Sequence, residues 1–219
     1  MKRTFSLLLV LVCGLVFTSC LKEDTGFGVI TPEVSKKWID AASGNYRGMM
    51  YVINTKTGEG VTFTTEATVT ANDSIITVSP FPVKGLAKYA LGETAEMLEK
   101  CDQSVNGTFK AELHPYNGGV PHTYTFYMFP TTETMDVKTT WKGVDYNISI
   151  TWGTDITLTE AAYIRYGYGE RYIFPLADFD VTLSNIYGHI LIKEFKVNNE
   201  VYNTPILYDL NVSKTSVTW

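Results

Sequence analysis

Residues 144–152 read VDYNISITW and alternate strictly between apolar and polar side chains. A period of two residues is typical of a β-strand with one face in the core and the other in water. Half-solvated strands of this kind occur in antiparallel sheets, whereas parallel strands are buried on both faces. This stretch therefore predicts an antiparallel β fold.

The same alternation recurs in residues 61–71, 179–183 and 206–212. Between such runs lie dipeptides that are typical of tight hairpin turns. They are Thr57-Gly58, Asn72-Asp73, Gly118-Gly119, Lys142-Gly143 and Asn198-Asn199. We expect roughly ten or eleven strands in all.

Two segments depart from the strand period. Thr31 and Pro32 can cap and begin an amphipathic helix that ends at Gly44. Its apolar face comprises Val34, Trp38, Ala41 and Ala42. We expect this helix to cover one end of the β structure, with Trp38 as its plug. Residues 83–100 favour short helical pieces, broken at Gly85 and Gly92, that form a crossover between two groups of strands.

The sequence contains no low-complexity linker and no internal repeat. We therefore expect residues 31–219 to form a single β-rich domain. We predict an antiparallel β sandwich with one N-terminal helix and a short helical crossover. A lipocalin-like barrel is the alternative, because the hairpins are consistent with an up-and-down arrangement.

The N-terminal segment has the layout of a secretory signal peptide. Lys2 and Arg3 are followed by an apolar run, residues 7–16, which is shorter than the ~20 residues that a membrane-spanning helix needs. Cys20 follows Thr18 and Ser19, an arrangement that resembles the lipobox of bacterial lipoproteins. The resemblance implies that residues 1–19 are removed and that Cys20 is lipidated, leaving residues 20–30 as a flexible tether.

Lys22, Glu23 and Asp24 directly follow this cysteine. Such a lysine and two acids resemble the signal that sends Bacteroidota lipoproteins to the outer face of the outer membrane. The resemblance implies an outer-membrane, lipid-anchored and surface-exposed protein whose first partner is the membrane itself.

The longer outline also resembles a family of Bacteroidota lipoproteins with no assigned function. It combines the lipobox, the acidic tether, the stretch SGNYRG at residues 43–48 and the stretch SPFPV at residues 79–83. The resemblance implies an envelope β protein and supplies no catalytic residues.

Composition and motif spacing argue against several function classes. A formal net charge of −5 gives nucleic acid no basic surface to bind. His114, His122 and His189 are scattered without the ligand spacing of a zinc site. The sequence has no G-x-S-x-G elbow and no phosphate loop, and no calcium loop surrounds Asp178 and Asp180. We therefore expect neither an enzyme nor a metal or cofactor, and we expect Cys101 to be a small buried residue.

Tyrosine is abundant, at 14 residues, and concentrates between residues 163 and 172. If residues 166–168 form a strand, Tyr166 and Tyr168 point the same way, and the neighbouring glycines leave both rings open. With Arg165 and Arg171 beside them, these rings form a candidate ligand platform, since a sugar ring has an apolar C–H face and a polar rim.

Asp73-Ser74-Ile75 resembles the O-glycosylation sites of exported Bacteroidota proteins, which makes Ser74 a candidate modification site. The leading hypothesis is a non-catalytic envelope lipoprotein that binds a glycan or another envelope protein. A fimbrial subunit and a lipocalin-like carrier of an apolar ligand remain alternatives.

Overall fold

A computed structural model describes residues 30–114, 122–166 and 172–215. The helical elements are α2 (Pro32–Ala42), the 3-10 helix η1 (Val83–Tyr89), α3 (Gly92–Glu99) and α4 (Glu160–Tyr166). The strands before residue 153 are β1 (Gly44–Asn54), β2 (Gly60–Thr70), β3 (Ile75–Ser79), β4 (Gly107–Leu113), β5 (Thr123–Pro130), β6 (Thr134–Trp141) and β7 (Val144–Trp152). The later strands are β8 (Ile156–Thr157), β9 (Tyr172–Ile173), β10 (Leu176–Asp180), β11 (Asn185–Val197), β12 (Glu200–Tyr202) and β13 (Ile206–Lys214).

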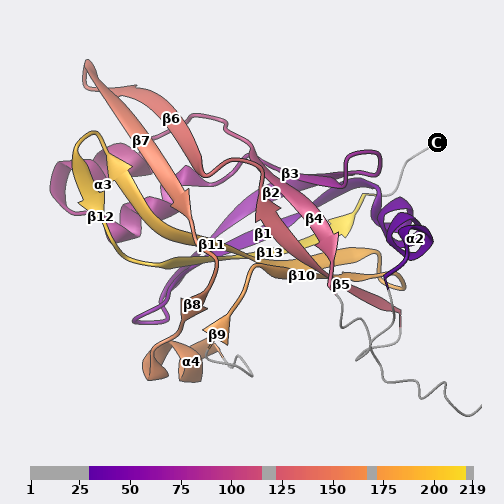
Figure 1. Ribbon diagram of the computed structural model, residues 1–219. Helices are drawn as coiled ribbons and strands as arrows, with labels where there is room; N and C mark the ends of the chain where they lie inside the picture. Colours follow the sequence, from indigo (N-terminus) through magenta and orange to yellow (C-terminus); the bar gives the residue numbers. More distant parts are fainter. Residues whose placement is uncertain (1–29, 115–121, 167–171, 216–219) are drawn as a thin grey trace, which may run out of the picture.

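Eight of these strands form a closed antiparallel barrel (Figure 1). Their order around the wall is β10, β5, β4, β3, β2, β1, β13 and β11. The barrel closes because β10 pairs with β5 on one side and with β11 on the other. The prediction of a mainly β, antiparallel fold is confirmed. Of the two architectures considered, the closed sheet matches the barrel and differs from the two separate sheets of a sandwich.

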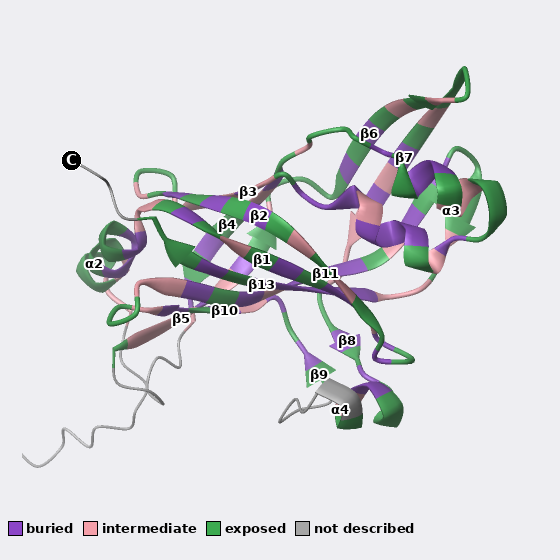
Figure 2. Ribbon diagram, turned by 180° about the vertical axis from the view of Figure 1, so that it is seen from behind, coloured by how far each residue is buried: buried purple, intermediate pink, exposed green. Residues whose placement is uncertain are grey.

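The barrel interior is filled with large side chains. Buried and exposed bands alternate along the strands, because successive side chains point to opposite faces of the wall (Figure 2). Phe81 stacks on Tyr208 with ring centroids 5.0 Å apart. The other large, fully buried side chains on the strands include Tyr46, Phe109, Phe126, Phe179, Met50 and Ile76. Large buried side chains from several strands therefore occupy the barrel interior.

Helix α2 covers one end of the barrel, as predicted (Figure 1). The Thr31 hydroxyl accepts a hydrogen bond from the Val34 amide at 3.3 Å and so caps the helix. Trp38 is 2% exposed and stacks on Phe126 of β5 with centroids 4.9 Å apart. Ile39 and Ala42 are also buried, whereas Val34 and Ala41 are exposed. The predicted apolar face is therefore confirmed at Trp38 and Ala42 and wrong at Val34 and Ala41.

An arm extends from the barrel at the end opposite α2 (Figure 1). It consists of β6, β7, β12 and the last part of β11. Strand β11 is long enough to leave the barrel, and its register shifts between Ile192 and Glu194, which indicates a β-bulge. Beyond the bulge β11 pairs with β7 and β12, and β7 pairs with β6. Met97 and Leu98 of α3 are buried within the same hydrophobic core as the arm residues Val137 and Ile148. The predicted helical segment is confirmed as η1 and α3, although it joins the neighbouring strands β3 and β4 and not two separate groups of strands, and Gly85 lies within η1.

A second, smaller core lies on the outside of the barrel wall. The segment containing β8, α4 and β9 contributes Ile156, Leu158, Ala162 and Ile173, and the barrel contributes Ile53, Leu191 and Leu207. These three barrel residues occupy paired positions on adjacent strands, with Ile53 opposite Leu207 and Leu207 opposite Leu191. The segment is therefore docked on one patch of the wall.

Four of the five predicted turns lie within the described residues, and each joins two strands or lies between them. The β6–β7 turn has positive φ at both Lys142 and Gly143, the backbone that a two-residue hairpin turn favours. The Gly118-Gly119 turn lies outside the described residues. The strand predicted through residue 183 is wrong at its end, because β10 stops at Asp180. The Asp180 carboxylate accepts hydrogen bonds from the amides of Thr182 and Leu183, which favours a turn over a strand.

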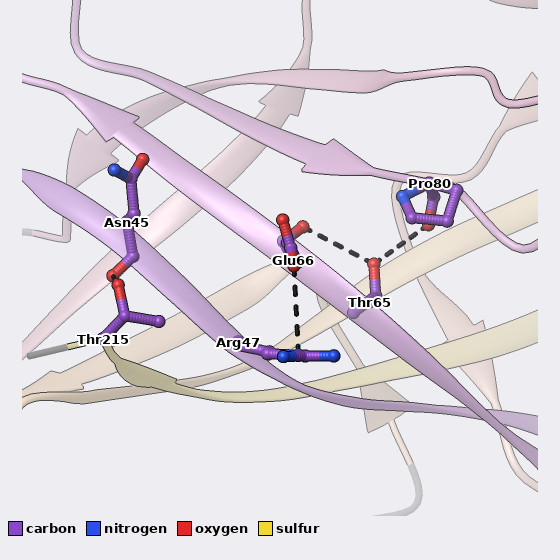
Figure 3. A network of polar contacts seen from close by, with 6 residues as sticks. All are labelled: Asn45, Arg47, Thr65, Glu66, Pro80 and Thr215. Carbon is purple, nitrogen blue, oxygen red and sulfur yellow. Dashed lines mark hydrogen bonds and ion pairs between the residues drawn. The ribbon is translucent and has the colours of Figure 1, made fainter.

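One hydroxyl group points into the buried side of β2. Thr65 occupies a core position between Phe63 and Ala67 and is fully buried. Its Oγ1 donates to the Pro80 carbonyl at 2.9 Å, just beyond β3 (Figure 3). Arg47 and Glu66 face each other nearby at 3.9 Å, and this ion pair contributes little to stability because both side chains are exposed to solvent (Figure 3). The Thr65 bond is therefore the polar contact here that matters for folding.

We predict that Thr65→Val lowers the free energy of unfolding by about 0.5–1.5 kcal/mol, because the near-isosteric valine keeps the buried shape of Thr65 but loses its hydrogen bond to the Pro80 carbonyl. Urea denaturation measures the loss. Thr62→Val, at an exposed position of the same strand, is the matched control and should change stability by less than about 0.5 kcal/mol. Equal effects from the two variants would contradict the role of this hydrogen bond.

Candidate functional site

Three aromatic rings form a ladder on the outer face of the barrel, which we call the aromatic ladder and define as His114, Tyr127 and Phe129. Phe126 and Met128 of β5 face the core, so Tyr127 and Phe129 face outward. The Tyr127 and Phe129 rings stack with centroids 5.2 Å apart and planes at 23°. The His114 ring, just after β4, lies 4.9 Å from the Tyr127 ring. The result is a continuous aromatic strip on the wall.

The strip stays in contact with solvent. Phe129 is 41% exposed, and Tyr127 and His114 are half-buried. Phe174, two residues before β10, is 46% exposed. The next residue, Pro175, accepts a hydrogen bond from the Met128 amide at 2.8 Å, which holds this segment beside β5. Aromatic side chains that remain exposed in a group on a folded wall are typical of binding surfaces.

Charged side chains flank the ladder on both sides. Lys110 and Glu112 lie opposite Phe129 and Tyr127 in the β4–β5 register, and their side chains form an ion pair at 2.8 Å. On the β10 side, the Asp178 carboxylate accepts a hydrogen bond at 2.6 Å from the hydroxyl of Thr125, which lies on β5 two residues before Tyr127. The ladder is thus an apolar strip with hydrogen-bonding groups along its edges.

A groove of about 580 Å³ lies on the far side of Lys110 and Glu112, beneath α2. Its walls are α2, the β2–β3 turn and β4. The polar lining residues are Ser35, Lys36, Asp40, Asn72, Ser74, Lys110 and Glu112, and the apolar lining residues include Ile30, Ile39, Ala71 and Leu113. Because Lys110 and Glu112 line the groove and also flank the ladder, the two features are adjoining parts of one surface. A volume of this size falls in the range of small-molecule sites.

The strand predicted to carry Tyr166 is a helix in the structure. Residues 160–166 form helix α4, so the strand alternation predicted for Tyr166 is wrong. The Thr159 hydroxyl accepts from the Ala162 amide at 3.4 Å and donates to the Lys56 carbonyl at 2.6 Å, which caps the helix and ties it to the β1–β2 turn. This tertiary support overrides the strand preference of tyrosine.

The remaining platform residues are only partly described. Tyr163 packs against the second core, and Tyr172 is largely exposed. Tyr168 and Arg171, and the side chains of Arg165 and Tyr166, lie outside the described residues. The N-terminal residues Cys20, Lys22, Glu23 and Asp24 lie outside them as well.

Two other predicted residues have clear positions. Ser74 is half-buried in the β2–β3 turn, has a φ of 53° and lines the groove beneath α2. Cys101 is buried, as predicted. Beside it, the exposed Asp102 carboxylate accepts a hydrogen bond from the Lys84 ammonium, which lowers the pKa of Asp102. These residues line a smaller hollow of about 300 Å³.

Motif spacing did not predict the pairing of His189 on β11 with a carboxylate on β13. His189 Nδ1 lies 2.7 Å from an Asp209 carboxylate oxygen, and Asp209 is 4% exposed. The residues are 20 positions apart and meet because β11 pairs with β13. A buried carboxylate requires a partner of this kind.

Two features are absent from the described ranges. There, no group of three His, Cys, Asp or Glu side chains is placed to hold a metal ion. In those same ranges, no helix combines the length and the apolar character needed to cross a membrane.

Comparison with known proteins identifies a match to one protein family. The profile of a family described as a domain of unknown function, DUF4840, matches residues 41–170, which is more than half of the sequence. The match runs from the end of α2 through α4 and includes the aromatic ladder. No curated protein matches the chain.

Proposed function

The chain belongs to the DUF4840 family of unknown function, and we propose that it is a non-catalytic, lipid-anchored envelope protein that binds a glycan on its aromatic ladder. The observation that carries this proposal is the exposed stack of Tyr127 and Phe129, continued by His114. Stacked rings on a rigid strand offer a preformed apolar strip at little entropic cost.

The chemistry of the ladder fits a sugar better than a purely apolar ligand. A pyranose ring presents an apolar C–H face that covers an aromatic ring, and its hydroxyl rim needs donors and acceptors. Lys110 and Glu112 supply both along one edge of the ladder, and Asp178 and Thr125 lie along the other. The ladder takes over the role that the sequence first suggested for Tyr166 and Tyr168.

The two alternative functions, a carrier of an apolar ligand and a fimbrial subunit, receive less support. A carrier needs a cavity inside the barrel, and the interior of this one contains the stacked rings of Phe81, Tyr208, Trp38 and Phe126. A fimbrial precursor would be cleaved after an arginine, and Arg47 lies inside β1, which pairs with both β2 and β13. Neither alternative has an observation in its favour as direct as the exposed ladder.

The location follows from the N-terminal sequence. Lipidation at Cys20 holds the chain to the outer membrane, and Lys22, Glu23 and Asp24 direct it to the cell surface. In that location the ladder meets external or envelope glycans.

Replacing Cys20 by Ala should abolish metabolic labelling with palmitate and release the protein into the soluble fraction, because stable attachment requires several acyl chains. Cys13→Ala is the matched control and should keep both label and membrane attachment, since Cys13 lies within the apolar run. A labelled, membrane-bound Cys20→Ala protein would show that the anchor is elsewhere.

The binding prediction uses a glycan array probed with the full chain in a mild non-ionic detergent. Tyr127→Ala with Phe129→Ala should weaken binding about thirtyfold, taking each stacked ring as ~1 kcal/mol. The melting temperature should change little, because Phe129 is exposed and Tyr127 only half-buried.

The control for this double variant is Met49→Ala with Tyr51→Ala. These residues are exposed to similar degrees on the outer face of β1, on another part of the wall. The control should bind as the unmodified chain does. The proposal is wrong if the array gives no signal, or if both double variants bind equally well.

A further inference from the structure

We propose that the groove beneath α2 is a second subsite and that the complete site takes an uncharged oligosaccharide, extending from the aromatic ladder across β4 into the groove. This inference rests on the proposed function and goes further, because it specifies the length and the charge of the ligand.

Strand β4 connects the aromatic ladder with the groove beneath α2. Lys110 and Glu112 have their Cα partners in Phe129 and Tyr127 on one side. On the other side the Ala111 amide donates to the Ser74 carbonyl at 2.7 Å, which holds the β2–β3 turn against β4. Neighbouring strands are about 4.8 Å apart, so a chain of sugars lying across β4 reaches both the ladder and the groove.

The groove is lined by side chains that can form hydrogen bonds with the hydroxyl groups of a sugar. The hydroxyls of Ser35 and Ser74 and the amide of Asn72 each donate and accept hydrogen bonds. Ile39, Ala71 and Leu113 provide apolar surface for C–H faces. A sugar chain offers the same mixture of small apolar faces and groups that both donate and accept.

The charges of the groove indicate an uncharged ligand. Its described lining has two lysines and two acids, and they pair with each other. Lys36 binds Asp40 at 2.7 Å, and Lys110 binds Glu112 at 2.8 Å. A uronic acid or a sulfated sugar would therefore meet no cation that lacks a partner carboxylate, and its own charge would be desolvated without compensation.

The test measures the affinity of the full chain in mild detergent for neutral oligosaccharides of increasing length. The probes are the disaccharides and hexasaccharides of β-linked glucose and of mannose, with an oligogalacturonate hexamer as the acidic chain. For the neutral sugar that binds, the hexasaccharide should bind at least about tenfold more tightly than the disaccharide, since only the longer chain occupies the groove. The acidic hexamer should bind more weakly than the neutral one.

Lys36→Ala with Asn72→Ala should remove this gain from length and leave disaccharide binding on the ladder unchanged. The matched control is Lys37→Ala with Asp73→Ala, which changes exposed neighbours in the same helix and turn that do not line the groove. The control should keep the full gain. Melting temperatures of both variants should match that of the unmodified chain, because all four side chains are exposed.

The outcomes separate this inference from the proposed function. Equal affinity for short and long neutral sugars overturns the second subsite while leaving the ladder intact, and so does a length gain that survives Lys36→Ala with Asn72→Ala. Tighter binding of the acidic hexamer overturns the neutral ligand class. If no sugar of either length binds, the proposed function fails, and this inference fails with it.

Discussion

Close contact between β10 and β11 decides whether the sheet closes. Ala177 of β10 lies opposite Gly188 of β11. A Cβ atom at Gly188 would lie only 2.3 Å from the Ala177 Cβ, so the two strands meet where one residue has no side chain. Because β10 also pairs with β5, this contact joins the two ends of an eight-stranded wall. Without it the wall would be an open sheet with two exposed edges.

Closure has consequences for both faces of the wall. On the inside, rings from distant strands meet and stack, and α2 seals one end with Trp38. On the outside, the wall is rigid and its side chains alternate with those of the core. Tyr127 and Phe129 point to solvent because Phe126 and Met128 point inward. The aromatic ladder therefore depends on the same register that builds the core.

The sequence was informative where a structure depends on local pattern. The alternation in residues 144–152 predicted β7, and Thr31 and Pro32 predicted the start of α2. It failed for Tyr166, which lies in α4, because the cap of this helix at Thr159 depends on a contact with Lys56 about 100 positions away. Closure by β10 also depends on pairing between distant segments, which no local period reveals.

The ladder was missed for a different reason. Residues 124–129 read YTFYMF, so both faces of this strand carry large apolar side chains, and the sequence does not say which face is outside. The one usable signal was that Tyr127 and Phe129 share a face opposite Phe126 and Met128. His114 joins them only through the pairing of β4 with β5. Thr65, a polar residue within an apolar alternation, was also visible in the sequence, but its partner Pro80 was not.

Native-state hydrogen exchange of the backbone amides tests most directly whether the wall is closed through β10. In a closed barrel the paired amides of residues 177–180 and 185–188 should exchange as slowly as those of β1 and β13, with the free energy of global unfolding. If β10 exchanges rapidly while β1 and β13 stay protected, the sheet is open at this seam and the account of the fold is wrong.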